Sequence, residues 1–215
     1  MKERTSQLLY AYWNETRGHR IAPQRFEIEP SRIAQILPET FILEREGRHE
    51  YMFRLAGTRI CDQFGREFRG RNLLDLWTPD DREILIRLLE SVTRDGAVGV
   101  AEVRGVLNGG RRVWFEMLLL PLLHTGQAIT RLLGSLTSAE ANPALDGTTL
   151  TDLRLGHFEV IWPDGRPHAV VSRTDHQAPF ARDMPPARMV RASGRSFKVY
   201  DGGLTEARPT GKESS

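Results

Sequence analysis

The side chains best suited to chemistry are few in this chain and lie scattered along it. There is one cysteine, Cys61, so no disulfide can form within the chain. The histidines show none of the spacings at which metal ligands recur, and we expect no metal centre. The six are His19, His49, His124, His157, His168 and His176. We interpret Cys61 as a small core or boundary residue.

Three short patterns resemble catalytic or phosphate-binding motifs, but each has a structural explanation. Asp80 and Asp81 are paired carboxylates, yet they stand at an expected helix start, where acids favour the positive end of the dipole. Leu133–Thr137 lacks the second glycine of a nucleophile elbow and follows a strand pattern. Gly109 and Gly110 suit a hairpin turn better than a phosphate loop. We therefore predict that the protein is not an enzyme.

Bulk composition is that of an ordinary globular protein. The chain has 215 residues, of which 40% are hydrophobic and 27% charged. A formal net charge of +2 gives no global field that would draw it to nucleic acid or an acidic membrane. The start lacks the apolar region of a secretory signal, and no stretch approaches the roughly 20 apolar residues of a membrane helix. We expect a cytoplasmic protein without membrane contact.

The C-terminal part is polar and contains a basic segment, Arg182–Lys198. Its neighbouring aromatics, Phe197 and Tyr200, lack the interleaving of a base-stacking platform, so we do not expect a nucleic-acid partner. We interpret the segment as a solvated tail, with docking to a protein partner as the alternative. About the last ten residues are expected to be disordered.

Helical periods occur at two main places. Residues 5–17 predict an amphipathic helix that Gly18 ends, with Leu8, Leu9, Tyr12 and Trp13 on one face. Residues 79–95 predict a second helix, which Thr78 caps and Gly96 ends. Only short helices are expected in the proline-containing segment before residue 40 and over residues 59–64.

Alternating apolar residues separated by turn residues predict strands. The strands cover residues 40–45, 51–56, 98–107, 111–120 and 128–137, with one more possible across 153–162. We therefore expect an α+β fold with a five-stranded antiparallel sheet and helices on one face. The predicted domain covers residues 1–138. Residues 139–215 are predicted to be a linker and a partly irregular extension.

The two faces of the expected sheet differ, because successive side chains of a strand point to opposite sides. The inner face is almost wholly apolar: Phe41, Leu43, Phe53, Leu55, Ala101, Val103, Phe115, Met117, Leu119, Leu132 and Leu136. The outer face mixes charge with large apolar groups: Ile42, Glu44, Met52, Arg54, Glu102, Arg104, Trp114, Glu116, Leu118, Arg131 and Leu133. We expect Leu9, Tyr12 and Trp13 of the N-terminal helix either to cover the outer face or to form a dimer seam.

Three runs carry a resemblance to a known family. They are Tyr10–Pro30, Tyr51–Arg82, which reads YMFRLAGTRICDQFGREFRGRNLLDLWTPDDR, and Met117–Thr137. Together with the order of elements, they resemble a PAS-like family of short stand-alone alphaproteobacterial proteins, over about residues 8–138. The resemblance implies a PAS fold, in which a pocket between sheet and helices takes a small ligand, or in which the domain binds other proteins.

The resemblance implies a class of function and not an activity. We predict a sensory or regulatory module that acts through protein contacts, as a homodimer and with an unidentified protein partner; a receptor for a cofactor or metabolite is the alternative. The cofactor stays open, because the run around Cys61 departs from the Asn-Cys-Arg-Phe of flavin photosensors and residues 79–95 contain no haem histidine.

Two sets of site residues follow from the resemblance and the face pattern. The predicted pocket is lined by Phe53, Phe64, Leu74, Trp77, Leu88, Val103, Phe115 and Met117. The structural alternative is that these are ordinary core residues. The predicted interface consists of Leu9, Tyr12, Trp13, Arg54, Arg104, Trp114, Glu116 and Arg131.

Overall fold

A computed structural model describes residues 1–107, 110–124, 128–138, 150–163, 169–171, 188–192 and 195–199. Its helices are α1 (Arg4–Arg17), α2 (Thr58–Phe64) and α3 (Pro79–Asp95), with four 3₁₀ turns, η1 (Arg25–Glu27), η2 (Pro30–Ile33), η3 (Leu37–Glu39) and η4 (Leu73–Leu76). Its strands are β1 (Thr40–Gly47), β2 (Glu50–Ala56), β3 (Val98–Leu107), β4 (Arg112–Leu123), β5 (Ile129–Ser138), β6 (Leu150–Ile161), β7 (Ala169–Val171), β8 (Arg188–Ala192) and β9 (Arg195–Val199).

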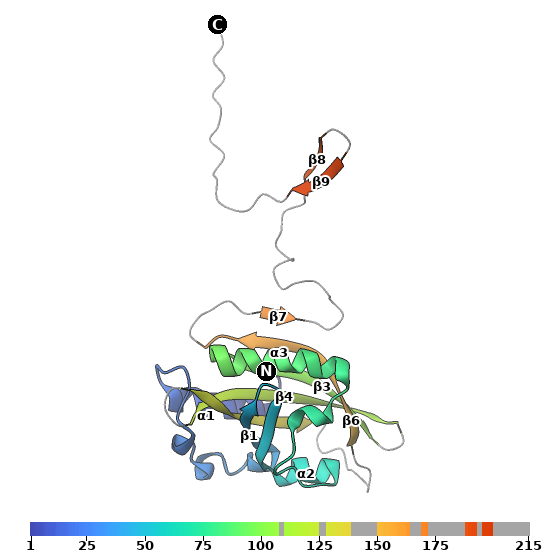
Figure 1. Ribbon diagram of the computed structural model, residues 1–215. Helices are drawn as coiled ribbons and strands as arrows, with labels where there is room; N and C mark the ends of the chain where they lie inside the picture. Colours follow the sequence, from blue (N-terminus) through green and yellow to red (C-terminus); the bar gives the residue numbers. More distant parts are fainter. Residues whose placement is uncertain are drawn as a thin grey trace. The chain divides into compact units, whose positions relative to one another are not determined.

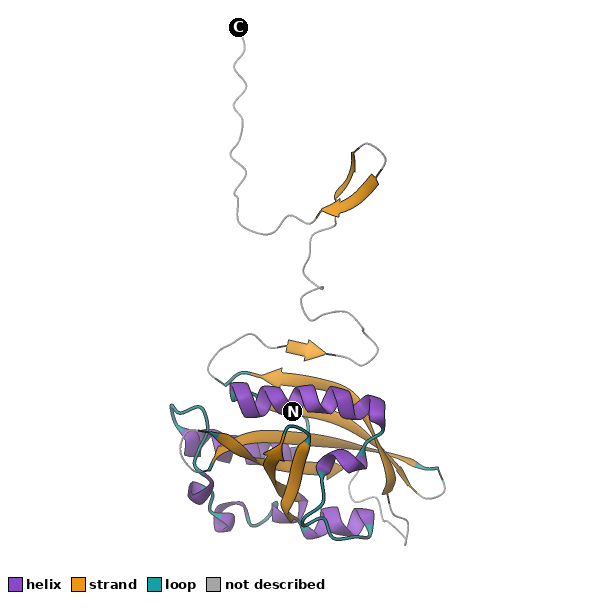
Figure 2. Cartoon of the chain, viewed as in Figure 1, coloured by secondary structure: helices purple, strands orange, loops and turns teal. Residues whose placement is uncertain are grey.

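The main sheet is antiparallel and has the strand order β2-β1-β5-β4-β3-β6-β7. Figure 2 shows its strands in orange and the helices in purple. The five strands predicted first lie together at one side of this order, so the α+β class and the antiparallel sheet are confirmed. The sheet is larger than predicted, because β6 pairs with β3 along most of its length and β7 pairs with β6. The sheet therefore continues into the predicted extension.

The inner face of the sheet forms the main core beneath α2, η4 and α3. This core joins apolar side chains of all three elements to those of β1–β6. Helix α3 begins after Thr78 and ends at Gly96, whose φ of 70° suits glycine. The Thr78 hydroxyl donates a hydrogen bond of 3.0 Å to the buried Asp81 carboxylate, so this predicted cap works through the acid and not through a helical N–H.

Helix α1 covers the other face of the sheet, which is the first of the two predicted arrangements (Figure 1). Leu9 and Trp13 are fully buried, and they pack with Leu118 and Leu133 of the sheet. The Trp13 indole N–H donates a hydrogen bond of 2.8 Å to the backbone carbonyl of Pro121. The helix is thus held to the sheet by apolar contact and by one directional bond.

A bulge in the first hairpin changes the predicted side of one residue. Leu43 lies opposite Phe53 but Ile42 lies opposite Leu55, so Arg54 is an extra residue in β2. The prediction that Leu55 faces inward is wrong: it lies beside Ile42 on the outer side and is 44% exposed. Strict alternation fails here because an inserted residue shifts the register by one.

The chain divides into two units, residues 1–176 and 177–215. The second unit contains the antiparallel pair β8–β9. Nearly all of the predicted linker and about half of the basic segment, as well as Asn108 and Gly109 of the predicted turn, lie outside the described residues. No helix within the described ranges is long and apolar enough to span a membrane.

Candidate interaction surface and pockets

Beyond the start of α1, the outer face of the sheet carries a partly exposed tryptophan. Trp114 of β4 is 45% exposed, although it shares its face with the covered Leu118. The Arg104 guanidinium carbon lies 5.3 Å from the centre of the Trp114 ring. Such a cation–π pair holds both planar groups in one orientation. The expectation that α1 covers Trp114 is therefore wrong. The residues before α1 contact Glu116 and Trp13 contacts Pro121, so the helix runs along the sheet away from Trp114.

Arginines extend this row across the sheet. Arg104 lies opposite Trp114 on one side and opposite Arg154 of β6 on the other. Arg112, two residues before Trp114 on the same face, is exposed, as is Arg154. The Arg104 Nε is buried without a hydrogen-bond partner, and none of the three arginines forms an ion pair among the described residues. We call Trp114, Arg104, Arg112 and Arg154 the tryptophan patch.

The acidic residues next to this patch bind the first residues of the chain. The Glu116 carboxylate accepts hydrogen bonds from the backbone N–H groups of Lys2, at 2.6 Å, and Glu3, at 3.2 Å. The Lys2 ammonium lies 2.6 Å from Glu102, and the hydrogen bond with Glu102 raises the Lys2 pKa. Glu116 is buried in this role, so it anchors α1 and leaves the patch basic.

Two other residues of the predicted interface, Arg54 and Arg131, lie in a separate cluster around Glu44. Both guanidiniums hydrogen-bond to the Glu44 carboxylate, Arg131 at 3.3 Å. Partial burial opposes ionisation of Glu44, but the Arg54 hydrogen bond and the Arg131 charge outweigh it and lower the pKa of the carboxyl group. Arg131 lies opposite Leu122, eight residues along β4 from the tryptophan patch and so about 27 Å away.

The predicted interface is therefore not brought together as one surface. Leu9, Tyr12 and Trp13 are buried against their own sheet, where they are not available to a partner. Arg104 and Trp114 form a patch with Arg112 and Arg154, two arginines that the sequence analysis left out. The sequence places Arg112 and Arg154 on predicted strands, but only the pairing of β6 with β3 shows that they lie in one row across the sheet.

The predicted pocket residues all lie in the inner core. Each of them is at most 7% exposed: Phe53, Phe64, Leu74, Trp77, Leu88, Val103, Phe115 and Met117. Two polar atoms buried in this region have no hydrogen-bond partner among the described residues, the Trp77 indole N–H and the Gln63 side-chain carbonyl. A buried polar atom without a partner is costly.

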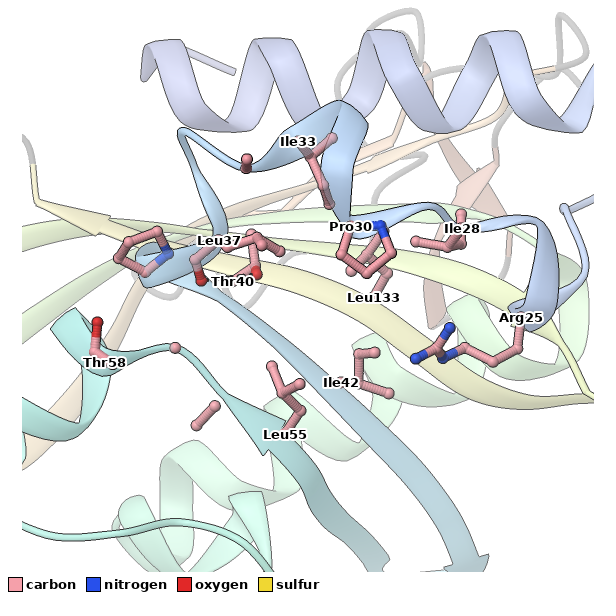
Figure 3. Close-up of a pocket in the computed structure, with 14 residues that line it drawn as sticks. Arg25, Ile28, Pro30, Ile33, Leu37, Thr40, Ile42, Leu55, Thr58 and Leu133 are labelled. Atoms are coloured by element: carbon pink, nitrogen blue, oxygen red, sulfur yellow. Dashed lines mark hydrogen bonds between the residues drawn. The ribbon is translucent and has the colours of Figure 1, made fainter.

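A different pocket, of about 390 Å³, opens on the outer side of β1 and β2 (Figure 3). Its walls come from the segment between α1 and β1, from Ile42 and Leu55 of the first hairpin, and from Leu133 of β5. Sequence reasoning missed it. The prolines Pro30 and Pro38 indicated an irregular segment, but the bulge that turns Leu55 toward this side has no local signal.

Cys61 lies on α2 and is buried at its predicted boundary position. Burial raises the pKa of its thiol, and the Glu67 carboxylate, 3.7 Å from the sulfur, raises it further. The thiol is therefore held in its weakly nucleophilic protonated form. No group of three His, Cys, Asp or Glu side chains converges as a metal site in the part of the chain that the structure describes.

Comparison with known proteins gives a family and a distant structural likeness. A family model described as a PAS domain matches residues 1–137. No curated protein matches the chain. One similar solved structure is titled "Structure of an RNA-binding Light-Oxygen-Voltage Receptor", with 15% sequence identity and a TM-score of 0.40. The match covers 54% of this chain and 35% of that one.

Proposed function

The chain belongs to the PAS domain family, and from this premise we propose that it is a regulatory module whose tryptophan patch binds an acidic surface of a partner protein. PAS domains serve sensory and regulatory roles, and this supports a binding function over catalysis. The observation that carries the proposal is the half-exposed Trp114 held under Arg104, next to Arg112 and Arg154, which form no ion pair with any described residue.

The composition of the patch is that of a binding hot spot. Trp and Arg are enriched among the few residues that supply most of the energy of protein interfaces. The Trp114 ring is already oriented by Arg104, so little side-chain entropy is lost on binding. An exposed aromatic ring that is surrounded by charged residues on a sheet face is stabilised when a partner removes it from water.

The charge of the patch selects the kind of partner. Arg104, Arg112 and Arg154 would face like charges if the patch met its own copy, whereas carboxylates would complement them. We therefore assign the patch to a different, acidic protein. The predicted homodimer, with α1 or the outer sheet face as its seam, stays a prediction that this patch does not support.

Photo-crosslinking in the native host tests this proposal. A benzoylphenylalanine in place of Arg112 should crosslink one defined protein, and Trp114→Ala or Arg104→Glu should abolish the crosslink while the melting temperature stays near that of the wild type. Phe26, which is 81% exposed on η1, is the matched control position. Equal crosslinking from position 26, or adducts that survive both substitutions, would show that the patch is not the contact.

We propose as a second candidate that a small molecule binds in the inner core. The Trp77 N–H and the Gln63 carbonyl support it, since both are buried without a partner among the described residues and an acceptor or a donor on a guest would satisfy either of them. Native mass spectrometry of freshly purified protein should then show an added mass that Gln63→Leu removes. A bare mass for the wild-type chain would count against this candidate.

A further inference from the structure

The pocket outside β1 and β2 is apolar along its length and has a cation at one end. Figure 3 shows the Arg25 side chain reaching in from η1 toward Ile42, with Thr58 at the opposite end. Between these ends the labelled walls are aliphatic apart from Thr40: Ile28, Pro30, Ile33, Leu37, Ile42, Leu55 and Leu133. Its volume of about 390 Å³ falls within the range of small-molecule sites, roughly 300–1,000 Å³.

No residue in the described part of the chain neutralises the charge of this pocket. Arg25 is the only charged residue among the fourteen that line it. Its Nε is buried without a hydrogen-bond partner, and Arg25 forms no ion pair among the described residues. A guanidinium is best satisfied by a carboxylate, which accepts two of its N–H groups at once. The pocket therefore suits a ligand that has an anionic group at this end and an apolar body along the rest.

Contacts within the protein itself hold the backbone around the pocket in place. Gly57 lies where a Cβ would come within 2.3 Å of the carbonyl oxygens of Leu37 and Pro38, so only glycine permits this approach of the two walls. At the Arg25 end, the Leu123 N–H donates a hydrogen bond of 3.0 Å to the Pro23 carbonyl. Both walls are thus tied to the sheet, and the space between them is preformed.

From this geometry we infer that the pocket binds a medium-chain monocarboxylate, with the carboxylate on Arg25 and the alkyl chain along Ile33, Leu37 and Leu55. The site lies on the opposite side of the sheet from the inner core, and the inference does not rest on the proposed function. The bound alkyl chain would contact both the segment that follows α1 and the sheet. Binding would therefore affect α1, the helix whose start borders the tryptophan patch.

Methyl-resolved NMR of the full chain, titrated with decanoate below its micellar concentration, tests the inference. The methyl signals of Ile33, Ile42, Leu55 and Leu133 should shift and saturate. Those of Leu88 in the inner core should not. In calorimetry, affinity should rise about fourfold per methylene from hexanoate to decanoate, because each methylene leaves water.

Substitutions separate the charge from the apolar contact. Arg25→Gln should weaken decanoate binding about tenfold and leave decanol binding unchanged, whereas Arg25→Lys should keep most of the affinity for decanoate. Ala34→Trp, at an exposed residue of the lining, should fill the space and abolish binding of both ligands. Arg87→Gln, at an exposed arginine of α3 outside the pocket lining, is the matched control and should bind decanoate like the wild type.

Three results would overturn the inference. Decanoate that shows no saturable binding would do so, as would shifts centred on the inner core. The third is saturable binding that neither Arg25→Gln nor Ala34→Trp weakens. Because the crosslinking experiment uses other residues and another readout, failure here and failure of the proposed function can be told apart.

Discussion

Trp13 and Trp114 both lie at the outer face of the sheet, but their removal should affect the stability of the protein very differently. Trp13 is fully buried between α1 and the sheet, whereas Trp114 is 45% exposed beyond the helix. Trp13→Ala leaves a cavity the size of an indole, and such losses cost about 3–5 kcal/mol. That is a large share of the roughly 5–15 kcal/mol by which domains are stable.

Intermediate substitutions divide this cost into its parts. Trp13→Phe keeps most of the apolar contact but leaves the Pro121 carbonyl without the N–H donor it has at 2.8 Å. This should cost about 1–3 kcal/mol. Trp114→Ala loses a half-exposed ring and one cation–π contact, the latter worth about 0.5–1 kcal/mol at exposed sites. The expected order of destabilisation is therefore Trp13→Ala, then Trp13→Phe, then Trp114→Ala.

Urea unfolding followed by far-UV circular dichroism measures this order, since the signal does not depend on the removed fluorophores. The midpoint should fall most for Trp13→Ala, and the size of this fall should not vary with protein concentration. If Trp13→Ala cost no more than Trp114→Ala, α1 would not pack on its own sheet as described. If the cost depended on concentration, the helix would be covering a second chain.

Three further predictions concern single side chains. Iodoacetamide should alkylate Cys61 at pH 8 at least tenfold more slowly in the native chain than in urea, because burial and Glu67 raise the thiol pKa; equal rates would refute this. Glu116→Ala should lower the free energy of unfolding by about 1–2 kcal/mol, as loss of a helix cap does, and an unchanged urea midpoint would show that the carboxylate does not anchor α1. Since the pKa of Glu44 is lowered on folding, its ionised form stabilises the native state above about pH 4.5, and this stabilisation is lost as pH falls through the folded pKa. The difference in stability between the wild type and Glu44→Gln should therefore be present at pH 7 and shrink in acid; a difference that is constant with pH would contradict it.

Local patterns in the sequence predicted most of the elements correctly. Strand β3 has the predicted bounds, 98–107, and α1 and α3 end at the glycines expected to end them, Gly18 and Gly96. These features depend on residues a few positions apart, through side-chain period and cap chemistry, and so they are readable in a single chain. The alternation of β3–β5 likewise separated the two faces.

Sites made by distant segments were not predicted. The start of α1 meets Glu116 more than a hundred residues away, and the tryptophan patch needs β6 beside β3. The bulge at Arg54 moves Leu55 into the outer pocket, and no neighbour in the sequence announces that extra residue. A register shift is decided by which side chains must be buried on the whole face.

The sequence by itself therefore determined the elements, the fold class and the apolar inner face, because periodicity and turn chemistry act over a few residues. Only the tertiary structure decided where α1 stops on the sheet, which arginines lie beside Trp114, and that Arg25 reaches into an apolar pocket. Those outcomes depend on long-range packing, in which strand order and burial bring together groups that are far apart along the chain.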